Sequence, residues 1–136
     1  MKTLIPYLHF NGNCDEALKF YAEAFAGKVT QISRFGDGPM EVPAAKKNHI
    51  MHARFEAESI RFMASDGMDK DGMTPGTSVQ LSIDFTDRDE MERVWSKLEK
   101  GGSVKMPLGD QFWGARFGML QDKYGVHWML NSETKK

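Results

Sequence analysis

The chain has 136 residues, of which 27% are charged and 40% hydrophobic, and its formal net charge is −1 at pH 7. This length suits one domain that buries a core without covalent staples, and the near-zero charge offers no long-range field to attract nucleic acid. The only cysteine, Cys14, excludes an internal disulfide and suits a reducing compartment. No apolar run approaches membrane-spanning length and no signal peptide is visible, so we expect a cytoplasmic protein without a nucleic-acid or membrane partner.

One pattern occurs twice along the chain. Asp15 aligns with Asp89, and Gly27 with Gly101, at a single offset of 89 − 15 = 74 residues. Self-similarity at a fixed spacing indicates that one supersecondary unit is used repeatedly. The chain has room for two such units.

The first unit begins with an apolar, strand-like run over residues 4–10. A helix follows, because apolar side chains recur at three- and four-residue steps. Its predicted buried stripe is Cys14, Ala17, Leu18, Tyr21, Ala24 and Phe25. Gly27 is expected to end the helix in a left-handed conformation. Strand composition then recurs three times, over residues 29–34, 49–55 and 59–65.

The second unit repeats this order, with a strand over residues 79–85 and then a helix. Asp87 and Glu90 have the spacing of a variant capping box at the start of that helix. The predicted buried stripe is Met91, Val94, Trp95 and Leu98. Two more strands are predicted, over residues 115–121 and 126–131. The sequence therefore predicts a single α+β domain over residues 1–136, with module one at about 1–66, module two at about 77–132 and a joint at 67–76.

Three stretches carry a resemblance to a known superfamily. They are PYLHFNG from Pro6, ALKFYAEAF from Ala17, and FWGARFGMLQDKYGVHW from Phe112. With the internal repeat, they resemble the glyoxalase/bleomycin-resistance/dioxygenase superfamily, the vicinal oxygen chelate fold, and are most similar to its PhnB-like branch. That branch usually has Asp-Pro-Phe-Gly where this chain has Asp-Lys-Tyr-Gly at residues 122–125. The resemblance implies two tandem βαβββ modules whose sheets curl around a shared cavity, usually in a homodimer.

The resemblance also implies where a metal ion would be held. Metal-dependent members take one ligand from the first and one from the last strand of each module, normally His or Gln and Glu. The corresponding positions here are Ile5, Met63, Ser78 and Met129. Isoleucine has no lone pair, a thioether is too soft for Mg, Mn, Fe(II) or Zn, and a serine hydroxyl is a poor donor. We therefore expect no metal and no cofactor, and assign no catalytic residue.

Strand periodicity predicts which residues line the cavity. If Ile5 and Met63 mark the concave face, every second residue shares it. Trp113 lies beside Gly114 in a turn and is either a pocket wall or a dimer contact. A mixture of apolar surface and a few polar groups suits a small molecule. The predicted pocket residues are Tyr7, His9, Arg61, Met63, Gln80, Trp113, His127 and Met129.

Two other features have both a functional and an ordinary interpretation. His49 and His52 resemble a chelating pair, but residues three apart on a strand point to opposite faces, so they are better explained as ordinary strand histidines. Cys14 begins a helix, where amide dipoles lower the pKa of a thiol, yet a small residue tucked at the helix start is the simpler explanation.

Three functions compete on this sequence. The first is a metal-free protein that binds or sequesters a small molecule. The second is a lyase- or dioxygenase-type enzyme, either metal-dependent or using His9, Cys14 or His127 as acid–base groups. The third is a dimeric interaction module without a ligand. Some names in this branch invoke a demethylubiquinone methyltransferase, but no Gly-rich loop follows a predicted strand to hold a methyl-donor nucleotide.

Overall fold

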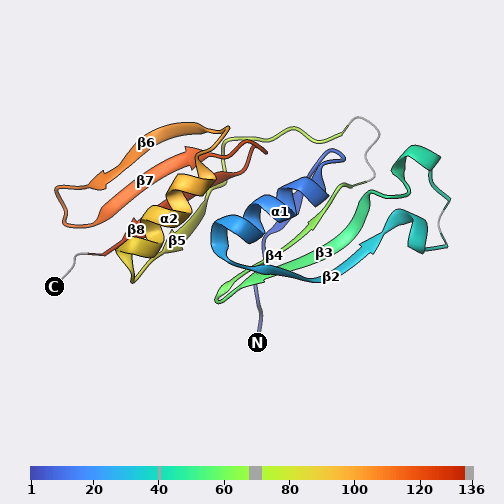
Figure 1. Ribbon diagram of the computed structural model, residues 1–136, viewed down its shortest axis with the longest axis horizontal. Helices are drawn as coiled ribbons and strands as arrows, with labels where there is room; N and C mark the ends of the chain where they lie inside the picture. The colour runs from blue at the N-terminus through green and yellow to red at the C-terminus, as the bar shows by residue number, and fades with distance from the viewer. Residues whose placement is uncertain (40, 68–71, 134–136) are drawn as a thin grey trace. The chain divides into compact units, whose positions relative to one another are not determined.

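The computed structural model describes residues 1–39, 41–67 and 72–133. The chain forms two compact units, Met1–Thr74 and Pro75–Lys136. Each unit contains one long helix and a four-stranded sheet (Figure 1). This is the predicted α+β arrangement of two tandem βαβββ modules.

The first unit has the strand order β1-β4-β3-β2. The first strand runs parallel to the last, and the other neighbours are antiparallel. Two short 3-10 turns, η1 (Phe35–Asp37) and η2 (Ala44–Lys46), lie in the long connection between the second and third strands. The main elements are β1 (Tyr7–His9), α1 (Cys14–Phe25), β2 (Lys28–Arg34), β3 (Ile50–Ala57) and β4 (Ile60–Ser65).

The second unit repeats this topology with the order β5-β8-β7-β6. Here too the first and last strands are parallel and the others antiparallel. Its elements are β5 (Leu81–Asp84), α2 (Arg88–Leu98), β6 (Ser103–Asp110), β7 (Arg116–Gln121) and β8 (His127–Ser132).

Both helices bury the predicted stripes. All six apolar residues expected on the first helix, and all four on the second, are the ones buried in α1 and α2. Asp87 is the N-cap of α2, and its carboxylate accepts a hydrogen bond from the Asp89 amide at 2.9 Å. The three- and four-residue spacing therefore identified correctly the buried face of each helix.

The end of α1 differs from the prediction by one residue. Ala26, with φ 55° and ψ 47°, is the left-handed residue, and Gly27 follows it. A Cβ at Gly27 would lie 2.6 Å from Cζ of Phe55 and 2.8 Å from the carbonyl oxygen of Glu56. Glycine is therefore required at this position because the chain passes close to β3, and not because of its φ.

Hydrophobic periodicity locates two of the three strands that follow α2 but gives no bounds for β6, the further strand that the βαβββ order implies. Pro107 and Gly109 interrupt its pattern, and register shifts occur on both sides of Met106 in its pairing with β7. Because β6 pairs only with β7, it is an edge strand, and an edge strand tolerates a residue without an N–H.

Each sheet has one face against its helix and one face turned away from it. In β4, Phe62 and Ala64 are buried, whereas Arg61 is exposed and Met63 half-buried. The Phe62 ring meets the Tyr21 ring of α1 edge-on, with centroids 5.5 Å apart. The same alternation occurs in β8, whose second and fourth residues are buried. We call the face opposite each helix the open face of that sheet.

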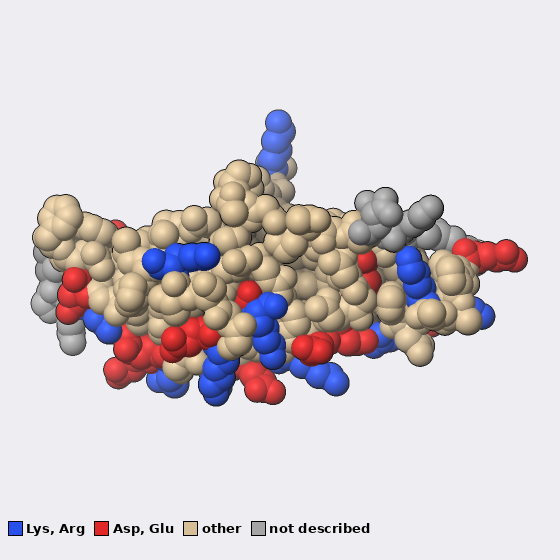
Figure 2. Space-filling model, turned by 90° about the horizontal axis from the view of Figure 1, so that it is seen from above, with Lys and Arg blue, Asp and Glu red and all other residues tan. Residues whose placement is uncertain are grey.

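The surface shows charges of both signs. Figure 2 shows Lys and Arg side chains interspersed with Asp and Glu on the face in view, without a patch of one sign. Within the described part of the chain, neither helix has the length and hydropathy to cross a membrane.

Replacement of Gly118 tests the packing of the second module. A Cβ at this position in β7 would lie 2.8 Å from Cη2 of Trp95 and 2.9 Å from Cα of Leu108. We expect Gly118→Ala to lower the free energy of unfolding by about 1–3 kcal/mol, because the core has no room for the methyl group. Chemical denaturation measures the change. Gly76→Ala is the control, since a Cβ there meets nothing within 4 Å; equal losses in both variants would contradict the packing.

Candidate functional site

The carboxylate of Asp66, directly after β4, organises one end of the first sheet. Its Oδ1 accepts hydrogen bonds from the amides of Gly12 and Cys14, each at 2.9 Å, and its Oδ2 accepts one from the Ile50 amide at 2.8 Å. Asn13, the N-cap of α1, makes no side-chain cap bond, so Asp66 caps the helix from the neighbouring strand. One side chain thus joins the end of β4 to the beginnings of α1 and β3.

Four polar and aromatic side chains gather on the open face at this end of the sheet. The Tyr7 hydroxyl lies 3.0 Å from Nδ1 of His52, and the Ser65 hydroxyl lies 3.3 Å from Nδ1 of His9. The rings of Tyr7 and His9 are stacked, with centroids 4.8 Å apart. We call Tyr7, His9, His52 and Ser65 the tyrosine–histidine cluster.

Strand pairing explains why this cluster forms. The parallel pair β1/β4 places Tyr7 opposite Met63 and His9 opposite Ser65, so alternate residues of two strands share one face. His52 comes from β3, the next strand in the sheet. The cluster combines the exposed side chains of Tyr7 and His9, the half-buried His52 and the buried Ser65, and the roles of its imidazole nitrogens depend on the tautomer. Such a surface can stack a flat molecule and orient it by hydrogen bonds.

A pocket of ≈ 200 Å³ adjoins the cluster. Its lining is largely apolar with one charge of each sign: Phe35, Glu41, Val42, Pro43, Lys46 and Gly67. A Cβ at Gly67 would lie 3.8 Å from Nδ1 of His9, so the wall of the pocket reaches the cluster. The sequence analysis missed this pocket because loop residues form it and hydrophobic periodicity carries no information about them.

In the second unit, His127 and Met129 lie on the open face of β8, as their alternation predicts. Pairing places Met119 of β7 on one side of Met129 and Ser82 of β5 on the other. Nearby, the Asn131 amide donates to Oδ1 of Asp84 at 3.2 Å. This surface is mainly thioether and imidazole with a polar border.

The eight predicted pocket residues divide between the two units. Tyr7 and His9 belong to the cluster, and Met63 and Arg61 share its sheet face; His127 and Met129 share the open face of β8. The remaining two are more peripheral: Gln80 is exposed just before β5, and Trp113 is 52% exposed with its ring 6.2 Å from that of Phe117. The cavity shared between the modules, and the choice between wall and dimer contact for Trp113, stay predictions.

The structure favours the simpler explanation of Cys14. Its side chain is completely buried at the start of α1. Burial is the largest cause that raises the pKa of its thiol, and the nearby carboxylates of Asp66 and Asp15 raise it further. The thiol therefore stays protonated at neutral pH and is not an activated nucleophile.

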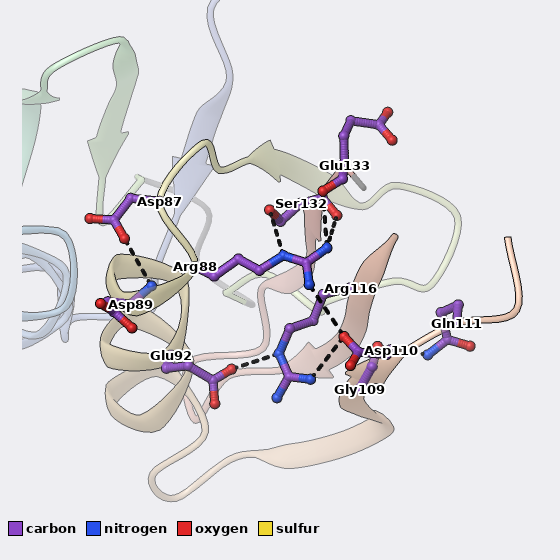
Figure 3. Close-up of polar contacts among 10 residues, drawn as sticks. All are labelled: Asp87, Arg88, Asp89, Glu92, Gly109, Asp110, Gln111, Arg116, Ser132 and Glu133. Atoms are coloured by element: carbon purple, nitrogen blue, oxygen red, sulfur yellow. Dashed lines mark hydrogen bonds and ion pairs between the residues drawn. The ribbon is translucent and has the colours of Figure 1, made fainter. Parts of the chain in front are cut away.

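Arg88 of α2 and Arg116 of β7 form ion pairs with carboxylates. Figure 3 shows Arg88 and Arg116 directed toward Asp110, at 3.5 and 3.3 Å, and Arg116 also donates to Oε2 of Glu92 at 2.9 Å. The hydrogen bond to Glu92 raises the pKa of Arg116. Because these guanidinium groups already have anionic partners, they hold α2 on its sheet and are poor candidates for an anion site.

The residues present do not fit the divalent ion of the metal-dependent superfamily members. Ile5 precedes β1 and Ser78 precedes β5, so neither lies in the first strand of its module as expected. The residue opposite Met63 is Tyr7, and the residue opposite Met129 is Ser82. A phenol, a hydroxyl and two thioethers are poor ligands for a hard divalent metal. Among the described residues, no three His, Cys, Asp or Glu side chains are grouped as a metal site.

The paired modules define the class of protein. The fosfomycin resistance protein FosX of Listeria monocytogenes, 12% identical over 98% of this chain and 95% of its own, superposes with a TM-score of 0.67 and shows the glyoxalase-like fold alone. The chain thus has the glyoxalase-like fold that its sequence resemblance implies. More narrowly, residues 2–131 match the family model described as 3-demethylubiquinone-9 3-methyltransferase, and the chain belongs to this PhnB-like family.

Several relatives are similar over almost their full length. A structure of protein PA1353 from Pseudomonas aeruginosa is 41% identical, covers 99% of this chain and 100% of its own, and has a TM-score of 0.87. A Bacillus cereus structure titled putative 3-demethylubiquinone-9 3-methyltransferase, PhnB protein, is 30% identical over 96% of this chain and 99% of its own, with a TM-score of 0.77. Protein YjdN of Escherichia coli K12 is 30% identical over 94% of this chain and 93% of its own length.

Removal of the Asp66 carboxylate tests its role at this end of the sheet. We expect Asp66→Ala to lower the free energy of unfolding by about 2–4 kcal/mol, because three backbone amides lose their hydrogen-bond acceptor. Hydrogen exchange at Gly12, Cys14 and Ile50 should also accelerate. Glu99→Ala, on an exposed residue, is the control and should change stability by less than about 0.5 kcal/mol. Unchanged exchange at the three amides would show that Asp66 does not hold them.

Proposed function

We propose that this protein binds or sequesters a small organic molecule on the open face of the first sheet, without a metal ion. The observation that carries the proposal is the tyrosine–histidine cluster beside the ≈ 200 Å³ pocket. Sites for small molecules typically combine apolar walls with a few placed polar groups. This part of the first unit offers both.

The lining suggests the class of ligand. Phe35, Val42 and Pro43 provide an apolar chamber, and the half-buried Met63 adds an adaptable thioether beside Tyr7. The hydroxyl and imidazole groups of the cluster suit a polar substituent of the same molecule. We therefore propose a ligand that has an aromatic or apolar part and at least one hydrogen-bonding group.

We propose that Arg61 contributes less to ligand binding than the tyrosine–histidine cluster. Arg61 lies on the same face as Met63 and is exposed, so it can approach an anionic substituent. Glu56 lies directly opposite it on β3. Because a carboxylate is its cross-strand neighbour, Arg61 is expected to contribute less to binding than the two rings of the cluster.

An acid–base enzyme is the second candidate function. The 3.0 Å contact between the Tyr7 hydroxyl and His52 favours it, since a phenol beside an imidazole is an arrangement that can move a proton. Cys14 is not a candidate acid–base group, because its side chain is buried. We do not propose methyl transfer, despite the family's description, because no described strand leads into a Gly-rich nucleotide-binding loop.

The assembly and location remain part of the proposal. A homodimer is proposed on the resemblance to the superfamily, and a cytoplasmic location on the presence of a single cysteine. The net charge of −1 and the interspersed charges of Figure 2 support the absence of a nucleic-acid partner. A membrane partner is not proposed.

A fluorescence titration with 8-anilinonaphthalene-1-sulfonate tests this function, because the probe joins an aromatic part to a polar group. We expect saturable binding that is unchanged by EDTA and about tenfold weaker in Tyr7→Ala, equivalent to ~1.4 kcal/mol. Phe112→Ala is the matched control, since it removes an aromatic side chain that is 98% exposed and outside the cluster.

Two results would contradict the proposal. Equal affinity in wild type and Tyr7→Ala would remove the cluster from the site. Loss of binding in EDTA would show that a metal ion is required and would favour the metal-dependent enzyme.

A further inference from the structure

Three methionines form a row across the second sheet. Met106 of β6 lies directly opposite Met119 of β7, and Met119 lies directly opposite Met129 of β8. The row therefore spans three adjacent strands, and we call it the methionine row.

All three side chains belong to the open face. The neighbours of Met119 are buried toward α2: a Cβ at Gly118 would meet the Trp95 ring at 2.8 Å, and Leu120 is 1% exposed. Met119 and Met129 are half-buried on the opposite face, and Met106 is 37% exposed. Directly opposite residues of antiparallel strands share a face, so Met106 joins the other two.

The spacing allows the three sulfur atoms to converge. Cβ atoms of directly opposite residues in a regular antiparallel pair are about 4.5–5.5 Å apart, and Met106 keeps its pairing with Met119 between the two register shifts of β6. A methionine side chain has three rotatable bonds and adapts its shape to what it contacts. The outer methionines can therefore turn their thioethers toward a common point above Met119.

The imidazole of His127 lies beside the methionine row. His127 is two residues before Met129 in β8 and shares its face. Within the described part of the chain, its Nε2 is buried and has no hydrogen-bond partner. A buried polar atom without a partner is costly, and a bound ligand would remove that cost.

Thioether and neutral imidazole are ligands for soft metal ions. Hard divalent ions prefer carboxylates and other oxygen donors, whereas methionine sulfur selects ions such as Cu(I). We propose that the methionine row and Nε2 of His127 form a site for one soft monovalent ion, Cu(I) or its analogue Ag(I). The ion binds and leaves in the same oxidation state, and the proposed ligands all belong to the second unit.

Titration of the intact chain with Ag(I) tests the site. Native mass spectrometry should show one tightly bound ion per chain. In protein carrying [methyl-¹³C]methionine, the methyl signals of Met106, Met119 and Met129 should shift most among the ten methionines. Signal shifts at other methionines, or no stoichiometric uptake of Ag(I), would overturn the proposal. This test uses the unaltered chain, so it does not depend on whether a variant folds.

Variants then identify the ligands. Met119→Leu keeps the side-chain volume and should weaken Ag(I) binding at least tenfold, whereas Met51→Leu, on β3 of the first unit, should leave it unchanged. His127→Gln should weaken binding while circular dichroism stays native. Equal affinity in Met119→Leu and Met51→Leu would exclude the methionine row.

The thiol of Cys14 needs its own control because cysteine sulfur, like methionine sulfur, is a ligand for soft metal ions. Cys14 is the only cysteine and is completely buried, so we expect Cys14→Ala to retain the ion. Loss of the ion in Cys14→Ala, with retention in Met119→Leu, would place the metal at the thiol and overturn the proposal.

Discussion

A four-stranded sheet with one helix can bury only one of its two faces, and this constraint determines the rest of the structure. In β4 the period of two places Phe62 against α1 and Met63 on the opposite face. In β8 it places Trp128 among the buried residues and Met129 on the open face. The hydrophobic effect stabilises the helix-covered faces, so the open faces are available for recognition.

Hydrogen bonds donated to single carboxylates then give each module its detailed geometry. Asp66 holds the beginnings of α1 and β3 beside the end of β4, which is where His9 and Ser65 meet. In the second unit the buried Asp122 accepts from the Trp128 indole at 2.8 Å and from the amides of Tyr124 and Val126. The turn at residues 122–125 therefore forms without the proline that related sequences have, because hydrogen bonds to the Asp122 carboxylate hold it.

The sequence predicted the features that depend on periodicity and failed for those that depend on loops and edges. Apolar spacing identified both helix stripes, and strand alternation placed Tyr7 and His127 on the open faces. The edge strand β6 could not be located by periodicity because Pro107 disrupts its pattern, and the pocket beside Gly67 could not be predicted because three separate segments of the chain form it. The place of His52 in the cluster could not be predicted, because its contact with Tyr7 joins residues 45 apart in the chain.

The proposed function depends on binding of a small molecule at the open face of the first sheet. The most direct test is an amide chemical-shift map of the ¹⁵N-labelled chain, titrated with 8-anilinonaphthalene-1-sulfonate in the presence of EDTA. We expect the largest shifts at Tyr7, His9, His52, Ser65 and Gly67. Shifts confined to the exposed turn around Phe112, or to the outer surface of α1, would contradict it.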